Sequence, residues 1–247
     1  MDNLNTQSLI EHLVDLRRCI VRSLWIILIG FVVSFYFSGQ IFELIRHPIM
    51  PYLPEGGLVF THPTEKFLAY IKVSFLSGAV VTCPLWIYQI WLFIAPGLYK
   101  HEKKTALKFI FFGSILFLCG VSFVYEIIFP LAFKYLLTFG NTIDKPMITI
   151  SEYLSFFIMT TLMFGLAFEM PLILVVLAMM DIIDDKFLRE KRRMAIFVLA
   201  ILAAIITPPD AISMLSMLGP LVLLYEISIF AVTRVTKKRA QEMAAQA

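Results

Sequence analysis

Long apolar stretches separated by short charged segments run through this chain. Six stretches hold no Asp, Glu, Lys or Arg, or only a single acid: 23–42, 73–99, 109–125, 153–180, 194–209 and 211–233. A helix that crosses the ~30 Å hydrocarbon core of a bilayer needs ~20 apolar residues. The pattern predicts an all-α integral membrane protein with six transmembrane helices, of which the fifth and sixth are short and share a tight turn at Pro208-Pro209-Asp210.

The positive charges predict the orientation of these spans. Six crossings place both termini on one side, and sixteen of the 21 Lys and Arg residues fall in the segments on that side: 1–22, 96–108, 181–193 and 233–247. The opposite loops, 38–66 and 130–152, hold two each. Because cytoplasmic loops carry the excess of Lys and Arg, we expect both termini in the cytoplasm. Residues 1–247 are expected to form a single transmembrane domain.

Composition excludes several classes of function. The chain is 60% hydrophobic and 16% charged, with a mean hydropathy of +0.84, whereas soluble domains are ~45–50% apolar and ~25% charged. The net charge of +3 does not indicate a nucleic-acid partner. Three cysteines without a C-x-x-C spacing and four scattered histidines indicate no disulfide framework, metal site or cofactor. No catalytic motif occurs, so we expect no enzymatic activity.

Prolines predict where the helices bend and where the chain turns. Segment 38–66 contains Pro48 and several further Pro and Gly residues, a composition that favours an ordered, extended and turned extracytoplasmic cap over a helix. A plain connecting loop is the alternative. Pro84 and Pro171 are expected to kink the second and fourth spans.

Two acids lie among cytoplasmic cations. An amphipathic helix is expected to lead into the first span, with an S-x-x-E capping box at Ser8 and Glu11. This box leaves Asp15 as the free carboxylate, next to Arg17, Arg18 and Arg22. In segment 96–108, Glu102 is the only acid among four lysines. The plain alternative for both acids is a solvated side chain or a favourable helix-end charge.

Glu169 lies near the middle of the fourth stretch. An ionised carboxylate there would cost ~2.5–3.5 kcal/mol or more. Pro171 removes a helical hydrogen bond nearby, so we expect a neutral, proton-donating Glu169 that faces a partner or a cavity. Gln89 is a weaker polar group of the same kind. Glu126 and Glu226 lie nearer span ends, from which a side chain can reach the membrane interface.

Several short motifs together resemble the TatC family, the multi-span subunit of the twin-arginine protein translocase. They occur in family order over residues 8–235 and are HLVDLR (12–17), PLWIYQIW (84–91), FIAPGLYKHE (93–102), FPLAF (129–133), FGLAFEMP (164–171) and TPPD (207–210).

The resemblance implies a receptor in the bacterial cytoplasmic (inner) membrane that binds twin-arginine signal peptides of folded cargo. Asp15 and Glu102 match the two acids of the family's signal-peptide site, and Phe93 matches an aromatic residue of that loop region. Arg17, in the first matching stretch, is expected to belong to the same site. Glu169 matches a span-four Glu implicated in contact with the single-span partners TatA and TatB, with which the chain would form an oligomeric complex. The resemblance also implies export driven by the proton-motive force. The family often has Glu where this chain has the shorter Asp15.

The chemistry of the two acids agrees with this role. Carboxylates accept the bidentate hydrogen bonds of guanidinium groups, and such a site must be partly sheltered, because exposed ion pairs contribute little. The alternative function is a small ion- or proton-coupled transporter with Glu169 as the proton carrier. Transporters more often contain inverted repeats with paired broken helices, and we find no such symmetry in the sequence.

Overall fold

The computed structural model describes residues 2–53, 57–94, 106–138, 147–207 and 211–246, and nearly all of them are helical. The helices in chain order are α1 (Asp2–Tyr36), α2 (Ser38–Arg46), the 3-10 turn η1 (Met50–Tyr52), α3 (Glu65–Val81), α4 (Cys83–Ile94), α5 (Ala106–Phe123), the π-helical η4 (Val124–Ile128), α6 (Phe129–Thr138), α7 (Ile150–Phe168), α8 (Met170–Met179), α9 (Asp185–Glu190), α10 (Arg192–Ile206) and α11 (Ala211–Gln246).

Among the residues that the structure describes, four helical segments are long and apolar enough to cross a membrane, which makes this a multi-pass membrane protein. They are Leu13–Tyr36, Lys108–Leu137, Ile150–Met179 and Ala211–Lys237. The bent pair of α3 and α4 forms a fifth candidate, with an angle of 59° between the two helices. The predicted fifth span corresponds to α10, which has only 15 residues. The count of six therefore stays a prediction.

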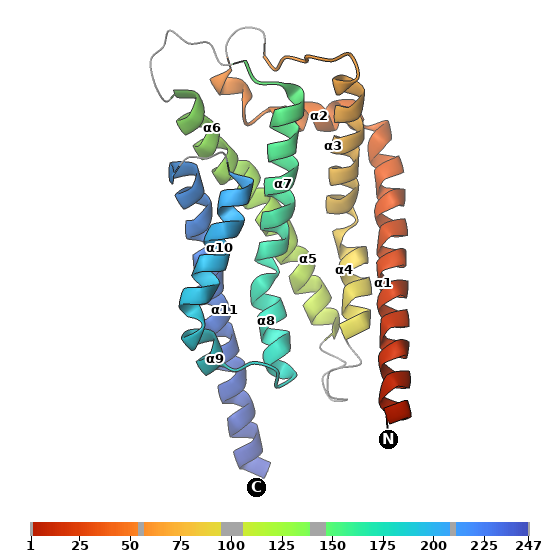
Figure 1. The fold of residues 1–247 in the computed structure, drawn as a ribbon, viewed down its shortest axis with the longest axis vertical. Helices are drawn as coiled ribbons and strands as arrows, with labels where there is room; N and C mark the ends of the chain where they lie inside the picture. The colour runs from red at the N-terminus through yellow and green to blue at the C-terminus, as the bar shows by residue number, and fades with distance from the viewer. Residues whose placement is uncertain (1, 54–56, 95–105, 139–146, 208–210, 247) are drawn as a thin grey trace.

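The helices stand side by side with the start of α1 and the end of α11 at the same end of the molecule (Figure 1). At the opposite end lie α2 and the starts of α3 and α7. The end of α10 and the start of α11 stop short of the level that α7 reaches at that end. The prediction of a short sixth span is wrong, because α11 has 36 residues and its candidate membrane segment has 27. Charged residues limit an apolar run, but they do not end a helix.

The cap at this opposite end is partly helical, which corrects the expectation of an extended and turned segment over 38–66. Helix α2 forms because Phe42 and Ile45 lie one turn apart and both become buried. Tyr125 donates a hydrogen bond to the carbonyl of Leu44 at 2.9 Å, and the Tyr153 hydroxyl donates to the carbonyl of Ile45. Two helices of the bundle thus hold the end of α2 in place.

The rest of the described cap is tied to the start of α7. The Val59 amide donates a hydrogen bond to the carbonyl of Ile148 at 3.0 Å, and the Ile150 amide donates one to the carbonyl of Val59 at 2.8 Å. Thr149 then caps α7 by accepting a hydrogen bond from the Glu152 amide at 3.2 Å. These bonds position the entry of the long helical segment formed by α7 and α8.

The first helix begins earlier than the sequence predicts. Helix α1 starts at Asp2 and continues without interruption to Tyr36, so Ser8 lies inside the helix and does not cap it. The capping-box prediction is wrong because the residues before Ser8 also adopt helical geometry. The carboxylate of Asp15 therefore projects from the middle of one long helix.

Two glycines let α1 and α3 approach each other closely. A Cβ atom on Gly78 would lie 2.5 Å from the backbone nitrogen of Phe31, and one on Gly30 would lie 2.8 Å from the carbonyl oxygen of Gly78. Small residues at such crossings are typical of helix pairs in membranes, where close packing replaces hydrophobic burial as the source of association. This crossing fixes α1 against the bent pair α3 and α4, and so sets where Asp15 lies.

Candidate functional site

Asp15 and Arg17 lie in the first half of α1, and Phe93 is the next-to-last residue of α4. The start of α1 and the end of α4 point toward the same end of the molecule (Figure 1). Asp15 is exposed, and its carboxylate accepts a hydrogen bond from Arg18 at 3.3 Å, three residues along the same helix. The side chains of Arg18 and Asp15 are 66% and 60% exposed, so this ion pair contributes little stability. Arg17 is exposed, and Phe93 is half-buried near the end of α4. Glu102 falls outside the described residues.

An apolar groove of about 380 Å³ separates α1 from the end of α4. Six residues of α1 and three of α4 line it, beginning at Leu16, the residue directly after Asp15, and including Phe93. Cys19 lies on its wall, where the buried thiol donates to the backbone carbonyl of Gln89 at 3.2 Å. Phe93 thus lines an apolar surface that begins next to Asp15, and sequence reasoning missed this surface.

Glu169 lies at the break between α7 and α8, with Pro171 at the second residue of α8. Its side chain is buried, and Oε1 has no hydrogen-bond partner within the described part of the chain. The carboxyl group points at α5, because a Cβ atom on Gly113 would lie 3.1 Å from Oε2 and 3.4 Å from Oε1. The missing side chain at position 113 therefore provides the space that holds this acid.

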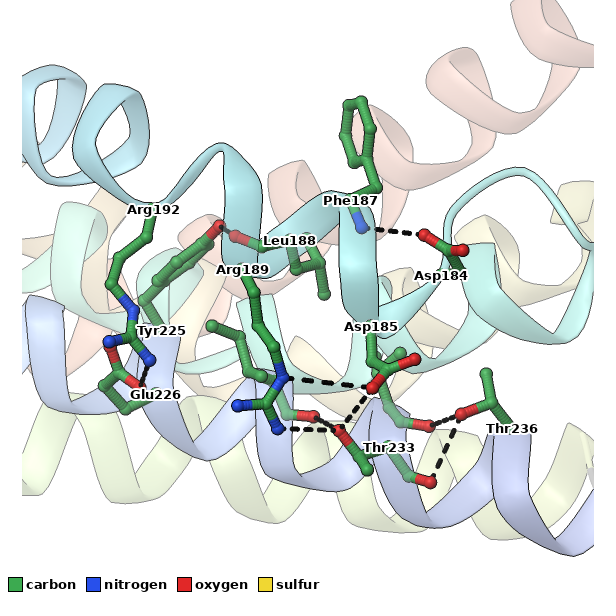
Figure 2. Close-up of polar contacts among 12 residues, drawn as sticks. Asp184, Asp185, Phe187, Leu188, Arg189, Arg192, Tyr225, Glu226, Thr233 and Thr236 are labelled. Carbon is green, nitrogen blue, oxygen red and sulfur yellow. Dashed lines mark hydrogen bonds and ion pairs between the residues drawn. The ribbon is translucent and has the colours of Figure 1, made fainter.

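Glu226, the acid of the last apolar stretch, is paired with a cation. Arg192, the first residue of α10, donates to its Oε2 at 2.8 Å (Figure 2). The two side chains are 44% and 41% exposed. The pair joins α10 to α11 across 34 residues of sequence, a contact that only the packing of these two helices reveals.

Further polar contacts attach the short helix α9 to α11 (Figure 2). Asp184 caps α9 by accepting from the Phe187 amide at 2.7 Å. The Tyr225 hydroxyl donates to the carbonyl of Leu188 at 2.8 Å, and Thr233 lies 3.4 Å from both Arg189 and Asp185. These contacts hold the basic segment 181–193 against the helix bundle.

The remaining predicted residues are spread over the molecule. Gln89 is half-buried in α4, and its Oε1 has no hydrogen-bond partner among the residues that the structure describes. Pro48 is buried directly after α2, and Pro84 is the second residue of α4, next to the 59° bend. Asp210 falls outside the described residues. The structure places Phe93 in the groove whose lining begins next to Asp15, whereas Glu169 lies at the α7–α8 break and faces α5.

Within the described residues, the structure contains no cluster of His, Cys, Asp and Glu that could hold a metal ion. The residues that sequence reasoning missed are Gly113 and the lining of the α1–α4 groove. The groove has a weak sequence signal, because Leu16, Ile20 and Leu24 recur every four residues beside the small Cys19 and Ser23. The space beside Gly113 has none, since it depends on how α5 packs on α7.

These features define a polytopic α-helical membrane protein with an exposed acid next to an apolar groove. The model of the family described as Sec-independent protein translocase protein (TatC) matches residues 11–220. The chain is similar to the Sec-independent protein translocase proteins TatC of Magnetococcus marinus and Helicobacter pylori strain J99. It is 38% identical to the first over 239 residues, which are 96% of this chain and 88% of that one. It is 42% identical to the second over 223 residues, which are 90% and 88%.

Solved structures agree with this match. A crystal structure of the twin-arginine translocase receptor TatC superposes with a TM-score of 0.83 at 38% identity, covering 91% of this chain and 99% of that chain. A second crystal structure of that receptor, in DDM, gives a TM-score of 0.82 at 37% identity and covers 90% and 99%. The chain belongs to the TatC family and is thus a multi-pass component of the Sec-independent protein translocase.

Proposed function

We propose that this chain is the receptor subunit of a twin-arginine translocase. It binds the signal peptides of folded cargo at Asp15 and Glu102, assisted by Arg17 and Phe93. Together with TatA- and TatB-type single-span proteins it forms an oligomeric complex that exports cargo across the bacterial cytoplasmic membrane, using the proton-motive force. Membership of the TatC family supports this function.

The exposed carboxylate of Asp15, at the same end of the molecule as Phe93, carries the proposal. Its present partner is a solvated guanidinium three residues away at 3.3 Å. An incoming arginine can replace this weak pair with a charge-assisted hydrogen bond, which is worth ~1.5–3 kcal/mol where the site is sheltered. The apolar groove between α1 and α4, which Phe93 lines, begins at Leu16, the residue next to Asp15.

The proposed topology has six spans with both termini and the Asp15 end in the cytoplasm. Two observations support it. Sixteen positive charges are concentrated in the segments of that side, and the start of α1 and the end of α11 lie at the same end of the molecule (Figure 1). Helix α10 would be the fifth span. Its 15 residues are fewer than a bilayer needs, so we expect local thinning of the membrane there.

Glu169 is proposed to contact a TatA- or TatB-type helix. The break between α7 and α8 interrupts the helical hydrogen bonding, and the unpartnered Oε1 is available there for a donor on another helix. Because the carboxyl group now faces α5, the partner would have to draw it away from Gly113 or pack over the break itself.

Binding of a labelled Arg-Arg signal peptide, compared with its Lys-Lys counterpart, tests the receptor function. We expect Glu102→Ala to lower Arg-Arg affinity at least tenfold, Asp15→Ala to have a smaller effect, and Asp15→Glu to leave binding equal or tighter, because it lengthens the reach of the carboxylate. Glu43→Ala is the matched control: this exposed acid also pairs with an arginine three residues away, at 2.5 Å, but lies at the opposite end. Arg-Arg selectivity that survives in the Asp15→Ala, Glu102→Ala double variant would overturn the proposal.

A further inference from the structure

The apolar groove between α1 and α4 begins directly beside Asp15. We propose that it binds the first apolar residues of the signal peptide, which follow the arginine pair in sequence. The peptide would then be held in two parts, with its arginines at the acids and its apolar side chains between α1 and α4. This inference rests on the proposed receptor function and adds a second site to it.

The spacing along α1 suits such a peptide. With a rise of 1.5 Å per helical residue, Cys19 lies about 6 Å and Ile27 about 18 Å along the helix from Asp15. An extended chain covers ~3.3 Å per residue, so a peptide whose arginine meets Asp15 reaches the near end of the groove within about two residues. Signal peptides place an apolar region after their positively charged region. The order of charge and apolarity in the peptide therefore matches the order of acid and groove on the protein.

The walls of the groove offer contact surface. Ile20, Leu24 and Ile90 are 50%, 56% and 40% exposed, which leaves their side chains free to contact an inserted segment. Cys19 and Ser23 are small and lie between them on α1, which leaves room between the larger side chains. The groove runs from the end of the bundle into the first candidate membrane span, Leu13–Tyr36, as an entering apolar segment requires.

A second hollow on α1 provides an internal comparison. It has a volume of about 350 Å³ and is lined by Val21, Leu24, Trp25, Leu28 and Phe75. Its first residue on α1 is Val21, six positions beyond Asp15, and no residue of α4 lines it, although Leu24 lines both hollows. This hollow is as apolar as the α1–α4 groove, but no carboxylate lies next to its first residue. A peptide anchored by its arginines at Asp15 would therefore not use it.

The test compares two adjacent residues of α1. Ile20 lines the α1–α4 groove and is 50% exposed, whereas Val21 lines the second hollow and is 43% exposed. Each is replaced by Trp in the full-length protein in nanodiscs. Affinity is measured for a long peptide with an arginine pair and an apolar segment, and for a short peptide that ends after the arginines. Both peptides are also prepared with Lys-Lys.

We expect Ile20→Trp to lower the affinity for the long peptide about threefold to tenfold, because the indole ring fills part of the groove that the apolar segment would occupy. Its affinity for the short peptide, and all values for Val21→Trp, should stay at the wild-type level. An unchanged long-peptide affinity in Ile20→Trp overturns the groove inference. If the wild-type protein binds the short Arg-Arg and Lys-Lys peptides equally well, the receptor function itself is overturned. Failure of the groove inference and failure of the receptor function therefore give different results.

A photo-reactive amino acid at position 20 or 21 gives a second readout that does not depend on filling the groove. We expect crosslinks from position 20 to the apolar segment of the long peptide and none from position 21. Crosslinks from position 20 to lipid alone, or to a co-purified single-span helix, would show a different occupant and overturn the inference.

Discussion

Glu169 and Glu226 are both acids within candidate membrane segments, yet the structure accommodates them in different ways. Glu169 is 8% exposed, and its Oε1 has no partner among the described residues. Glu226 is 41% exposed at its side chain and receives a hydrogen bond from Arg192 at 2.8 Å. Glu169 is accommodated in the space beside Gly113, and Glu226 is neutralised by Arg192 at the start of the neighbouring helix.

The different environments indicate a structural role for Glu226 and a functional role for Glu169. An acid paired with a cation on the next helix is already satisfied, and its role is to join α10 to α11. An enclosed acid with an unsatisfied oxygen carries a cost that its own neighbours do not offset. Glu169 is therefore the better candidate for a functional group, and the environments of the two acids can be altered independently, since they lie on different helices.

The largest effect is expected when the space beside Glu169 is filled. Gly113→Leu places a side chain where even a Cβ atom would lie 3.1 Å from Oε2 and 3.2 Å from Leu172. Overpacking of this kind costs about 1–3 kcal/mol, so we expect a lower unfolding temperature in detergent and reduced abundance in the membrane.

Two variants check that this loss arises from Glu169. A Cβ atom on Gly219 in α11 would meet nothing within 4 Å, so Gly219→Leu should stay close to the wild-type unfolding temperature. Adding Glu169→Ala to Gly113→Leu should restore part of the lost stability, because the two side chains are in contact. If the double variant is no more stable than Gly113→Leu alone, the glycine does not serve to accommodate this acid.

A smaller effect is expected at Glu226. Arg192→Ala should lower stability by about 0.5–1 kcal/mol, the upper range for a partly exposed ion pair. Glu226→Ala should cost less, because the long Arg192 side chain can still reach water from the start of α10. Thermal unfolding of both variants and of the double variant measures the coupling, with the exposed neighbour Arg193→Ala as the control. Equal losses for Arg192→Ala and Arg193→Ala would show that the pair contributes nothing.

The apolar runs and prolines predicted much of the fold. The break at Glu169 lies two residues before Pro171, and the bend between α3 and α4 lies directly before Pro84. Helix α2 was not predicted, since its prolines follow the helix and its two buried residues form only a short pattern. The start of α1 was misplaced because a sequence match to a capping box does not show that the helix begins there.

The site was less predictable than the fold. Asp15 and Glu169 could be found from their unusual surroundings in the sequence, one among cations and the other among apolar residues. Their actual neighbours could not, because Gly113 lies 56 residues from Glu169 and Arg192 lies 34 residues from Glu226. Contacts between residues so far apart in sequence depend on which helix faces pack together. In a membrane protein an apolar face can pack on another helix or contact lipid, so the sequence does not show which faces pair.

The smallest effect on stability is expected for Glu169→Gln. The amide has nearly the same shape as the carboxyl group, and the substitution removes no hydrogen bond at Oε1, which has none within the described chain. We expect the free energy of unfolding to change by no more than about 0.5 kcal/mol, at the lower end of what point mutations cause.

The same variant separates a functional from a structural role for Glu169. The glutamine amide can still accept a hydrogen bond from a partner helix and can also donate one, so co-purification of a TatA- or TatB-type protein should be largely kept. Glu169→Ala should reduce it while Arg-Arg peptide binding persists. Interhelical hydrogen bonds in lipid average only ~0.6 kcal/mol and reach ~1.7 kcal/mol, so a partial loss of recovery is expected. Unchanged partner recovery in Glu169→Ala would show that the acid serves only the packing at the α7–α8 break.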